Sequence, residues 1–289
     1  MLFPPKPFQA LCAAYASWYL WDFTSPFRGG WKVSWFRRLK WYQYCASYNS
    51  FKCIKEDLPA LKAASSSGPL MFGCHPHGVM CASVFHTFGF DHSESIQSCL
   101  PNVTFRVMTI KATFFVPLWR EFTQCLGFID ASRSSASEAF KKGHSVAIVP
   151  GGAAEALLGE HNSPALILNK RKGFCKLAIQ SEIEGLVPCF SFGENEMFDH
   201  ISTKSPIVNI PRKIMKNVAG VTMPLLYNIV PKRRPLRMVV GKPILLKDLE
   251  KTTEDEKIVE LHTLYVEELK ALYNRHKDDM GYGELNIVQ

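Results

Sequence analysis

Apolar runs alternate with short polar, glycine-containing segments along most of this chain. An apolar run of about six residues that ends in glycine or a polar residue is typical of a buried strand. This pattern predicts strands within residues 69–75, 105–110, 145–150, 185–192 and 236–244, the last of them closing in a turn. Apolar residues at helical spacing, with charges between them, predict a terminal amphipathic helix from Thr253 to Lys277.

The segments between these strands favour helices and loops. Val79–Phe90 is apolar with small residues and fits a helix, and a second helix is expected from Phe174 to about Glu184. A capping-box pattern at Ser134–Glu138 opens a further short helix. Ala63–Gly68 has the composition of a flexible loop. Residues 209–237 mix basic and apolar side chains, which fits either a second membrane-facing segment or a lid.

The opening residues have an unusual aromatic and basic composition. Residues 8–21 are nearly all apolar, but they fall short of the roughly 20 residues that a membrane-spanning helix needs. All the tryptophans except Trp119 lie in this opening stretch, interleaved with arginine and lysine. Such a mixture is typical of the headgroup level of a bilayer, although a helix packed on the protein's own core remains the alternative. We expect a half-inserted or re-entrant anchor at residues 1–50, followed by one domain at residues 51–289.

Composition narrows the environment of the protein. A chain of 289 residues with a net charge of +8 suits an anionic membrane surface or a polyanionic ligand such as a nucleotide. Nucleic acid is not expected as a partner, because the basic residues form no long tract and no known binding motif. The nine cysteines are odd in number and show no CxxC spacing, so we expect reduced thiols facing the cytosol and no metal site.

The candidate chemistry begins at His75-Pro76-His77-Gly78, directly after the first predicted buried strand. Proline fixes its own backbone and favours an extended conformation for His75, and glycine permits a sharp turn. His77 is therefore expected at the end of a strand, where a histidine accepts a proton near neutral pH. An ordinary turn that carries two histidines is the alternative interpretation.

Two later strands also end in glycine and polar residues. Gly151 and Gly152 precede Glu155, and Gly193 precedes Glu194 and Asn195. Ligands of open α/β sheets lie outside the carboxyl ends of the strands, so the three strand ends indicate one shared active site. Glu155 also fits a purely structural place in the first turn of a helix.

A basic cluster precedes the helix expected from Phe174. Arg171, Lys172 and Gly173 stand just before its first turn, where side-chain charge and free N–H groups together suit phosphate binding. A solvated basic loop is the alternative.

Together these motifs resemble the type 2 diacylglycerol acyltransferase family, which includes monoacylglycerol and wax-alcohol acyltransferases. Five segments carry the resemblance in the same order: Phe72–Gly78, Val149–Leu157, Arg171–Ile179, Leu186–Glu196 and Val239–Ile244. The resemblance implies an α/β fold like that of glycerolipid acyltransferases, with a central mixed sheet flanked by helices. It also implies an endoplasmic-reticulum membrane protein whose catalytic domain faces the cytosol, with the lipid-droplet surface as a second location.

Two departures from the family pattern bear on the site. Members usually carry a longer apolar N-terminal hairpin, of which only one short arm is present here. The wider superfamily uses a His-x4-Asp pair, but Met80 and Ala82 occupy that offset from His75 and His77. We therefore expect Glu155 to supply the acid that orients the catalytic imidazole.

The resemblance implies transfer of a fatty acyl group from acyl-CoA, as a substrate and without a further cofactor, to diacylglycerol. We expect His77 as the general base, His75 as a brace or an acceptor-positioning group, and Glu155 as the orienting acid. The expected oxyanion donors are backbone N–H groups near Gly78, Gly151 and Gly152. Arg171, Lys172 and Gly173 are expected at the CoA phosphates, and Glu194 and Asn195 either orient the substrate or brace the site.

Several alternatives stay open. Monoacylglycerol or a long-chain alcohol is an equally compatible acceptor, and a non-catalytic lipid-binding protein is a further reading. A lipid hydrolase is disfavoured because the sequence lacks a Gly-x-Ser-x-Gly pentapeptide. The partners implied are membrane lipids, acyl-CoA and diacylglycerol, and a homo-oligomer is left open.

Overall fold

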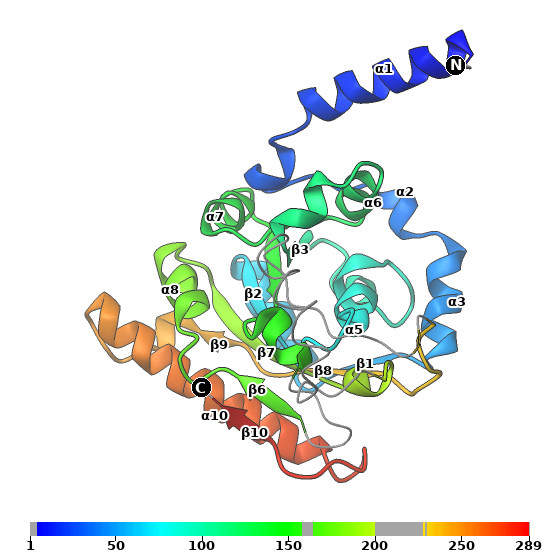
Figure 1. The fold of residues 1–289 in the computed structure, drawn as a ribbon. Coiled ribbons are helices and arrows are strands. Elements are labelled where there is room, and N and C mark those ends of the chain that lie inside the picture. The colour runs from blue at the N-terminus through cyan, green and yellow to red at the C-terminus, as the bar shows by residue number, and fades with distance from the viewer. Residues whose placement is uncertain (1–4, 158–163, 200–227, 229, 289) are drawn as a thin grey trace, which may run out of the picture.

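A mixed sheet organises the computed structural model, which describes residues 5–157, 164–199, 228 and 230–288. Within this part of the chain the sheet has eight strands in the order β1-β8-β7-β2-β5-β3-β4, and β9 pairs with β7 (Figure 1). The strands are β1 Lys52–Lys55, β2 Leu70–His75, β3 Phe105–Thr109, β4 Phe128–Asp130, β5 Ser145–Ile148, β7 Gly185–Phe192, β8 Arg237–Val240 and β9 Ile244–Leu245. A separate parallel pair joins β6 Ala165–Ile167 to β10 Asn286–Val288.

The centre of the sheet is parallel. Strand β2 pairs in parallel with β5 on one side and with β7 on the other, so the carboxyl ends of these three strands lie side by side. Strand β8 runs antiparallel to β7, which makes the sheet mixed. The predicted mixed α/β sheet is therefore confirmed, and the three strands predicted to end at one site are neighbours.

Helices cover both faces of the sheet. They are α1 Lys6–Trp21, α2 Ser34–Arg37, α3 Lys40–Tyr48, α4 Leu58–Ser67, α5 Ala82–Val84, α6 Trp119–Cys125, α7 Arg133–Lys141, α8 Gly173–Gln180 and α10 Glu254–His276. Short irregular helices include the π-helix Phe85–Gly89 and the 3-10 helices Lys111–Phe115, Gly152–Leu157 and Glu194–Glu196. Helices α8 and α10 lie together on one side, opposite α3 and α5 (Figure 1).

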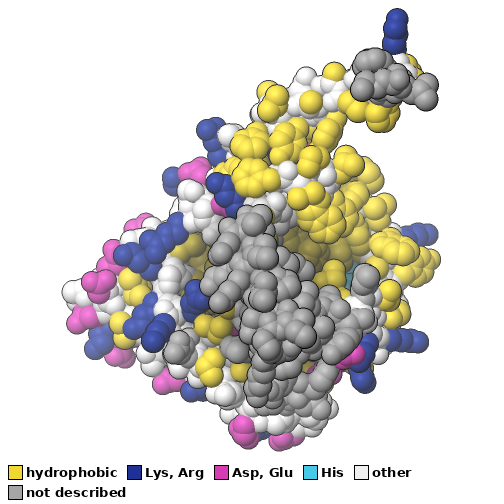
Figure 2. Space-filling model, in the orientation of Figure 1, with side chains coloured by type: hydrophobic (Ala, Val, Ile, Leu, Met, Phe, Trp, Pro, Cys, Tyr) yellow, Lys and Arg dark blue, Asp and Glu magenta, His cyan; other side chains and the backbone are white. Residues whose placement is uncertain are grey.

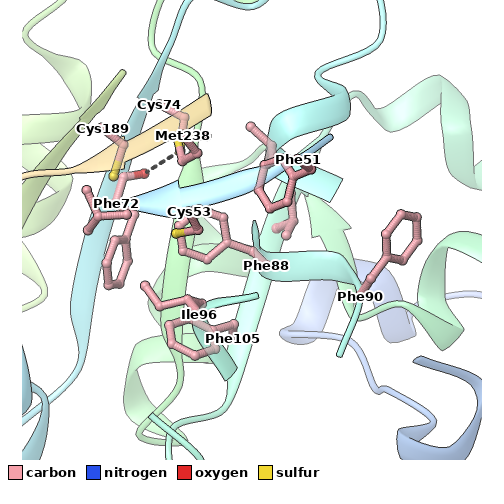
Figure 3. Close-up of a cluster of buried hydrophobic side chains, with 14 of the residues drawn as sticks. Phe51, Cys53, Phe72, Cys74, Phe88, Phe90, Ile96, Phe105, Cys189 and Met238 are labelled. Carbon is pink, nitrogen blue, oxygen red and sulfur yellow. Dashed lines mark hydrogen bonds between the residues drawn. The ribbon is translucent and has the colours of Figure 1, made fainter. Parts of the chain in front are cut away.

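The core forms two layers because successive side chains of a strand point to opposite faces of the sheet. In β2, Phe72 and Cys74 join the layer beneath α3 and α4, whereas Met71 joins the layer beneath α8 and α10. Figure 3 shows part of the first layer, in which Phe72 lies beside Phe88 and Phe105. The sheet thus holds β2 rigidly from both sides.

Most predicted elements are present, with boundaries that differ locally. The expected helix after residue 173 is α8, which ends at Gln180, and the short helix α7 is capped by Ser132 instead of Ser134. The helix expected over Val79–Phe90 begins only at Ala82 and continues as a π-helix. Of the segment 209–237, residues 209–227 and 229 lie outside the described residues.

The flexible loop predicted at Ala63–Gly68 is wrong, because residues 63–67 complete helix α4 and Gly68 is its C-cap. The Asp57 carboxylate accepts the Ala60 N–H at 3.0 Å and caps the helix start. The serine hydroxyls of the last turn donate to carbonyl oxygens of the preceding turn, which satisfies them inside the helix.

Helix α1 projects from the body of the protein, and none of its residues is buried (Figure 1). No helix among the described residues is long and apolar enough to cross a membrane. Tyr15 on α1 donates to Glu121 of α6 at 2.6 Å, which ties the helix to the body. Later in the same segment Tyr42 and Ala46 pack in the core, while the proposed division at residue 50 remains a prediction.

Candidate active site

The site lies where β2 ends at His75. The His75–Pro76 peptide bond is cis, and Gly78 adopts a φ of 56°, so the chain leaves the sheet through a tight turn. A β-carbon on Gly78 would lie 2.4 Å from Cγ of Glu194, so only glycine fits here. The predicted turn after β2 is present, and it separates the surroundings of the two histidines.

His75 is fully buried, and its imidazole makes two contacts. Its Nδ1 lies 3.5 Å from Oε1 of Glu155, and its Nε2 lies 3.1 Å from the hydroxyl of Tyr265 on α10. That hydroxyl also donates to the Gly73 carbonyl oxygen at 3.0 Å. Both ring nitrogens of His75 therefore face protein groups, which fits the predicted role of a brace.

Glu155 is the central carboxylate of the site and is 1% exposed. Its Oε2 accepts the backbone N–H of His77 at 3.0 Å, and its Oε1 accepts the backbone N–H of Ile167 in β6 at 3.0 Å. Gly151 makes room for it, because a β-carbon there would lie 1.9 Å from the carboxyl carbon. One side chain thus joins the ends of β2 and β6 to the 3-10 helix that follows β5.

The expected contact between Glu155 and the His77 ring is wrong. The carboxylate faces the His75 ring and reaches His77 only through its backbone, because Pro76 turns the chain between the two side chains. The His77 ring is oriented by its own turn, since Nδ1 lies 2.8 Å from the Gly78 carbonyl oxygen, which can only accept. Nδ1 is therefore the ring nitrogen that donates to this oxygen, and Nε2 is the nitrogen left for a further partner.

His77 is the half-buried histidine of the pair. Within residues 5–157, 164–199, 228 and 230–288, its Nε2 has no hydrogen-bond partner. Cys81 lies beside it, with the thiol donating to the His77 carbonyl oxygen at 3.0 Å. Burial, with help from Glu194, raises the pKa of Cys81 well above its usual value, so the thiol stays protonated and is no nucleophile.

The expected oxyanion donors differ in availability. The Gly152 N–H donates to the Val149 carbonyl oxygen at 3.1 Å, so it is already engaged and the expectation fails for this group. No hydrogen bond of the Gly78 or Gly151 N–H is found in the part of the chain that the structure describes. These two groups remain the candidates for an oxyanion.

Glu194 braces the turn. Its buried carboxylate accepts the Ala82 and Ser83 N–H groups at 2.8 and 2.9 Å and the Ser83 hydroxyl at 2.6 Å. Burial raises its pKa, although these hydrogen bonds oppose the shift. Of the two predicted roles the geometry favours the brace. Asn195 is half-buried, with no hydrogen bond found among the described residues.

The basic cluster lies at the start of α8. Arg171, Lys172 and Gly173 are all exposed, and the helix begins at Gly173 without a side-chain cap. Ile167, whose N–H donates to Glu155, stands only four residues before Arg171, a reach of at most about 14 Å. The backbone N–H groups of Arg171 and Lys172 donate to the carbonyl oxygens of Leu168 and Lys170, so an anion at this place would be bound by the two side chains and the first turn of α8.

Tyr265 is the residue that sequence reasoning missed. The pattern of residues 253–277 predicts an amphipathic helix, and a tyrosine among leucines on the apolar face of such a helix gives no sign of chemistry. The available signal was a glycine inside β2, because a β-carbon at Gly73 would lie 2.1 Å from the Tyr265 hydroxyl. No group of three or more metal-binding side chains occurs in the described ranges.

Neighbouring strand ends that carry a half-buried histidine and a buried carboxylate are typical of the ligand-binding edge of an α/β enzyme. The family is set by comparison: the diacylglycerol acyltransferase model matches residues 1–287. The chain belongs to this family of acyltransferases, which confirms the resemblance drawn from its five motifs.

The relatives include proteins named for diacylglycerol and proteins named for 2-acylglycerol as the acyl acceptor. Diacylglycerol O-acyltransferase 2A of Umbelopsis ramanniana is 34% identical over 280 residues, covering 91% of this chain and 76% of that protein. 2-acylglycerol O-acyltransferase 1 of Bos taurus is 33% identical over 285 residues, covering 93% of this chain and 82% of that protein.

One solved structure shows a distant likeness. The crystal structure of the 1-acyl-sn-glycerophosphate acyltransferase PlsC from Thermotoga maritima aligns with a TM-score of 0.49 and 10% identity, covering 82% of this chain and 77% of that one. A TM-score below 0.5 supports no conclusion about the site.

Proposed function

We propose that this protein is an acyl-CoA-dependent O-acyltransferase that esterifies diacylglycerol to triacylglycerol. Family membership supports the reaction class, and the carrying observation is the His77 ring, held through Nδ1 with Nε2 unpartnered among the described residues. A neutral imidazole with a free Nε2 is the form that a general base needs.

In the proposed reaction His77 Nε2 accepts the proton of the acceptor hydroxyl while its oxygen attacks the thioester carbonyl. The tetrahedral oxyanion is stabilised by the Gly78 and Gly151 N–H groups. Collapse breaks the carbon–sulfur bond, and the CoA thiolate takes the proton back from the imidazolium. No acyl-enzyme is formed, in keeping with a Cys81 thiol whose pKa is raised.

The acceptor is the finer part of the proposal. Relatives named for diacylglycerol and for 2-acylglycerol match this chain at similar identity, so monoacylglycerol is the alternative acceptor. A long-chain alcohol is the next alternative, with the same base and the same leaving group.

In the test, the purified protein is incubated with radiolabelled oleoyl-CoA and one acceptor at a time: diacylglycerol, monoacylglycerol or a long-chain alcohol. We expect triacylglycerol to form fastest, and His77→Gln to lower kcat by roughly 10²–10⁴-fold. His144→Gln is the matched control, because this partly buried histidine precedes β5 at the opposite end of the strand. Wild-type turnover by the His77 variant would exclude the base, and faster use of another acceptor would favour that alternative.

We further propose that the protein acts at the endoplasmic-reticulum membrane, facing the cytosol, and also at the lipid-droplet surface. Hydrophobic side chains gather over α1 and the body beside it (Figure 2). The exposed members include Trp21, Trp35, Trp41, Phe115, Val116, Leu118 and Trp119. All nine cysteines lie among the described residues as free thiols, which suits a reducing compartment.

A further inference from the structure

The Tyr265 hydroxyl occupies a defined position between β2 and α10. It lies 3.0 Å from the Gly73 carbonyl oxygen and 3.1 Å from Nε2 of His75, and Tyr265 is 0% exposed. Gly73 leaves the space for the oxygen, because a β-carbon there would lie 2.1 Å from it. The backbone of β2 is thus shaped to admit this hydroxyl beside the histidine.

Hydrogen-bond accounting fixes the proton on His75 Nε2. A tyrosine hydroxyl has one proton, and a carbonyl oxygen can only accept, so the proton of Tyr265 points to Gly73. Burial raises the pKa of Tyr265 well above its usual value, so the hydroxyl keeps that proton. Toward His75 the hydroxyl therefore presents a lone pair, and Nε2 must be the N–H donor.

The other ring nitrogen then needs a proton as well. Nδ1 faces Oε1 of Glu155 at 3.5 Å without a hydrogen bond to any described residue, and both side chains are fully buried. A bare Nδ1 lone pair would repel a carboxylate that is out of contact with water, whereas an N–H would attract it. Protonation of both nitrogens would make His75 and Glu155 a buried ion pair of zero net charge.

We propose that Tyr265 is a positioning residue that holds His75 as an imidazolium, and that this imidazolium fixes Glu155 beneath His77. The effect reaches the reacting base through the backbone, because Glu155 accepts the His77 N–H. This inference rests on the proposed function for its kinetic consequences, but the protonation of His75 is independent of any substrate.

Other titratable groups around the pair do not supply a competing charge. The pKa of Tyr265 is raised by burial and, to a smaller extent, by the nearby Cys189 on β7, Cys74 on β2, Cys175 on α8 and Glu155. Burial raises the pKa of Cys175 and Cys189, which keeps both thiols neutral. Glu194 points away to the start of α5, which leaves Glu155 as the carboxylate in contact with the His75 ring among the described residues.

The test compares Tyr265→Phe with Tyr273→Phe. Tyr273 is a matched control because it lies on the same helix, is 0% exposed, and donates its hydroxyl to the Gly283 carbonyl oxygen at 2.8 Å, away from the histidines. We expect Tyr265→Phe to lower kcat about tenfold with unchanged KM for acyl-CoA. We also expect the alkaline limb of the pH–rate profile to move to lower pH, because the imidazolium loses the hydrogen-bond acceptor of its Nε2. Tyr273→Phe should leave kcat, KM and the limb unchanged.

The second readout is the ¹⁵N NMR spectrum of histidine-labelled protein, with the His75 signals assigned by their loss in His75→Asn. Two protonated ring nitrogens are expected for His75 at neutral pH, and one unprotonated nitrogen in Tyr265→Phe. A single protonated nitrogen in the wild-type protein, or equal kinetics of the two tyrosine variants, would overturn the proposal. If the wild-type protein transferred no acyl group to any acceptor, the proposed function would fail while the NMR spectrum still decided the role of Tyr265.

Discussion

Gly151→Ala is the perturbation whose effect follows most directly from the geometry. The new methyl carbon would lie 1.9 Å from both the carboxyl carbon and Oε1 of Glu155, whereas ordinary contact begins at 3.4 Å. The carboxylate must therefore retreat by about 1.5 Å, the difference between these distances. Its two hydrogen bonds to His77 and Ile167, both 3.0 Å long, would not survive such a shift.

The magnitude follows from those two bonds. A hydrogen bond to a charged group contributes roughly 1.5–3 kcal/mol, so losing both costs about 3–6 kcal/mol. Total stability of a typical domain is about 5–15 kcal/mol, so the variant should fold with a strongly lowered melting temperature. At about 2 °C per kcal/mol for a chain of this size, the expected fall is roughly 6–12 °C.

The assay is thermal unfolding and acyl transfer of three glycine variants measured side by side. Gly152→Ala meets nothing within 4 Å but has a φ of 63°, so it should cost roughly 1–2 kcal/mol through backbone strain alone. Gly173→Ala meets nothing within 4 Å and opens α8, so it should leave stability unchanged or slightly higher. If Gly151→Ala matched Gly173→Ala in stability and kcat, the role of Glu155 as the link between the strands would be refuted.

Three further outcomes are expected. Arg171→Gln should raise KM for acyl-CoA about fivefold at unchanged kcat, because one charge-assisted contact with a CoA phosphate is lost. The control is Lys141→Gln on α7, where the lysine side chain is 72% exposed, and its KM should stay at the wild-type value. Equal KM values for the two variants would show that Arg171 is not part of the CoA site. Burial lowers the pKa of His86 to about 3, so its contribution to stability is complete above pH 6.5 and is lost as pH falls toward 3. When the free energy of unfolding is measured with urea over that pH range, its slope against pH should be smaller for His86→Phe than for the wild-type protein, by up to about 1.4 kcal/mol per pH unit. An unchanged slope would contradict the lowered pKa of His86. Leu118→Ser should weaken binding of the protein to anionic vesicles about tenfold, because Leu118 lies on the exposed apolar surface beside α1. Leu264→Ser is the control and should leave binding unchanged, because Leu264 is exposed on α10, away from that surface. Identical binding by the two variants would place the membrane contact elsewhere.

The strands of the site could be predicted because their signal is local. A fully buried parallel strand is a continuous apolar run, and β2, β5 and β7 all have this pattern. That they end in polar residues was enough to place three segments at one edge, since parallel strands share the direction of their ends. The sequence alone therefore predicts which strand ends lie side by side, although not the contacts between their side chains.

Those contacts could not be predicted because they depend on side-chain direction and on register between distant segments. His75 and His77 both flank Pro76, and spacing alone does not decide which ring turns inward to the buried carboxylate. Tyr265 reaches His75 across 190 positions of sequence, from a helix whose pattern shows only packing. The loop predicted at residues 63–68 was wrong because a run of serines is typical of loops. Here the serine hydroxyls donate to carbonyl oxygens of the preceding helical turn, which is compatible with a helix.

The position of Glu155 connects the two halves of the proposed reaction. Its Oε2 fixes the turn that carries His77, and its Oε1 fixes β6, from which the chain leads directly to Arg171 and the start of α8. In the proposed reaction His77 acts only on the transferred proton and Arg171 only on a distant phosphate, so their variants should separate kcat from KM. A displaced Glu155 disturbs both attachments at once, and a single side-chain shift should then change kcat and KM together. Under the proposed roles, the pairing of His75 with Glu155 matters to catalysis for this reason, because Glu155 is hydrogen-bonded both to the turn that carries His77 and to β6.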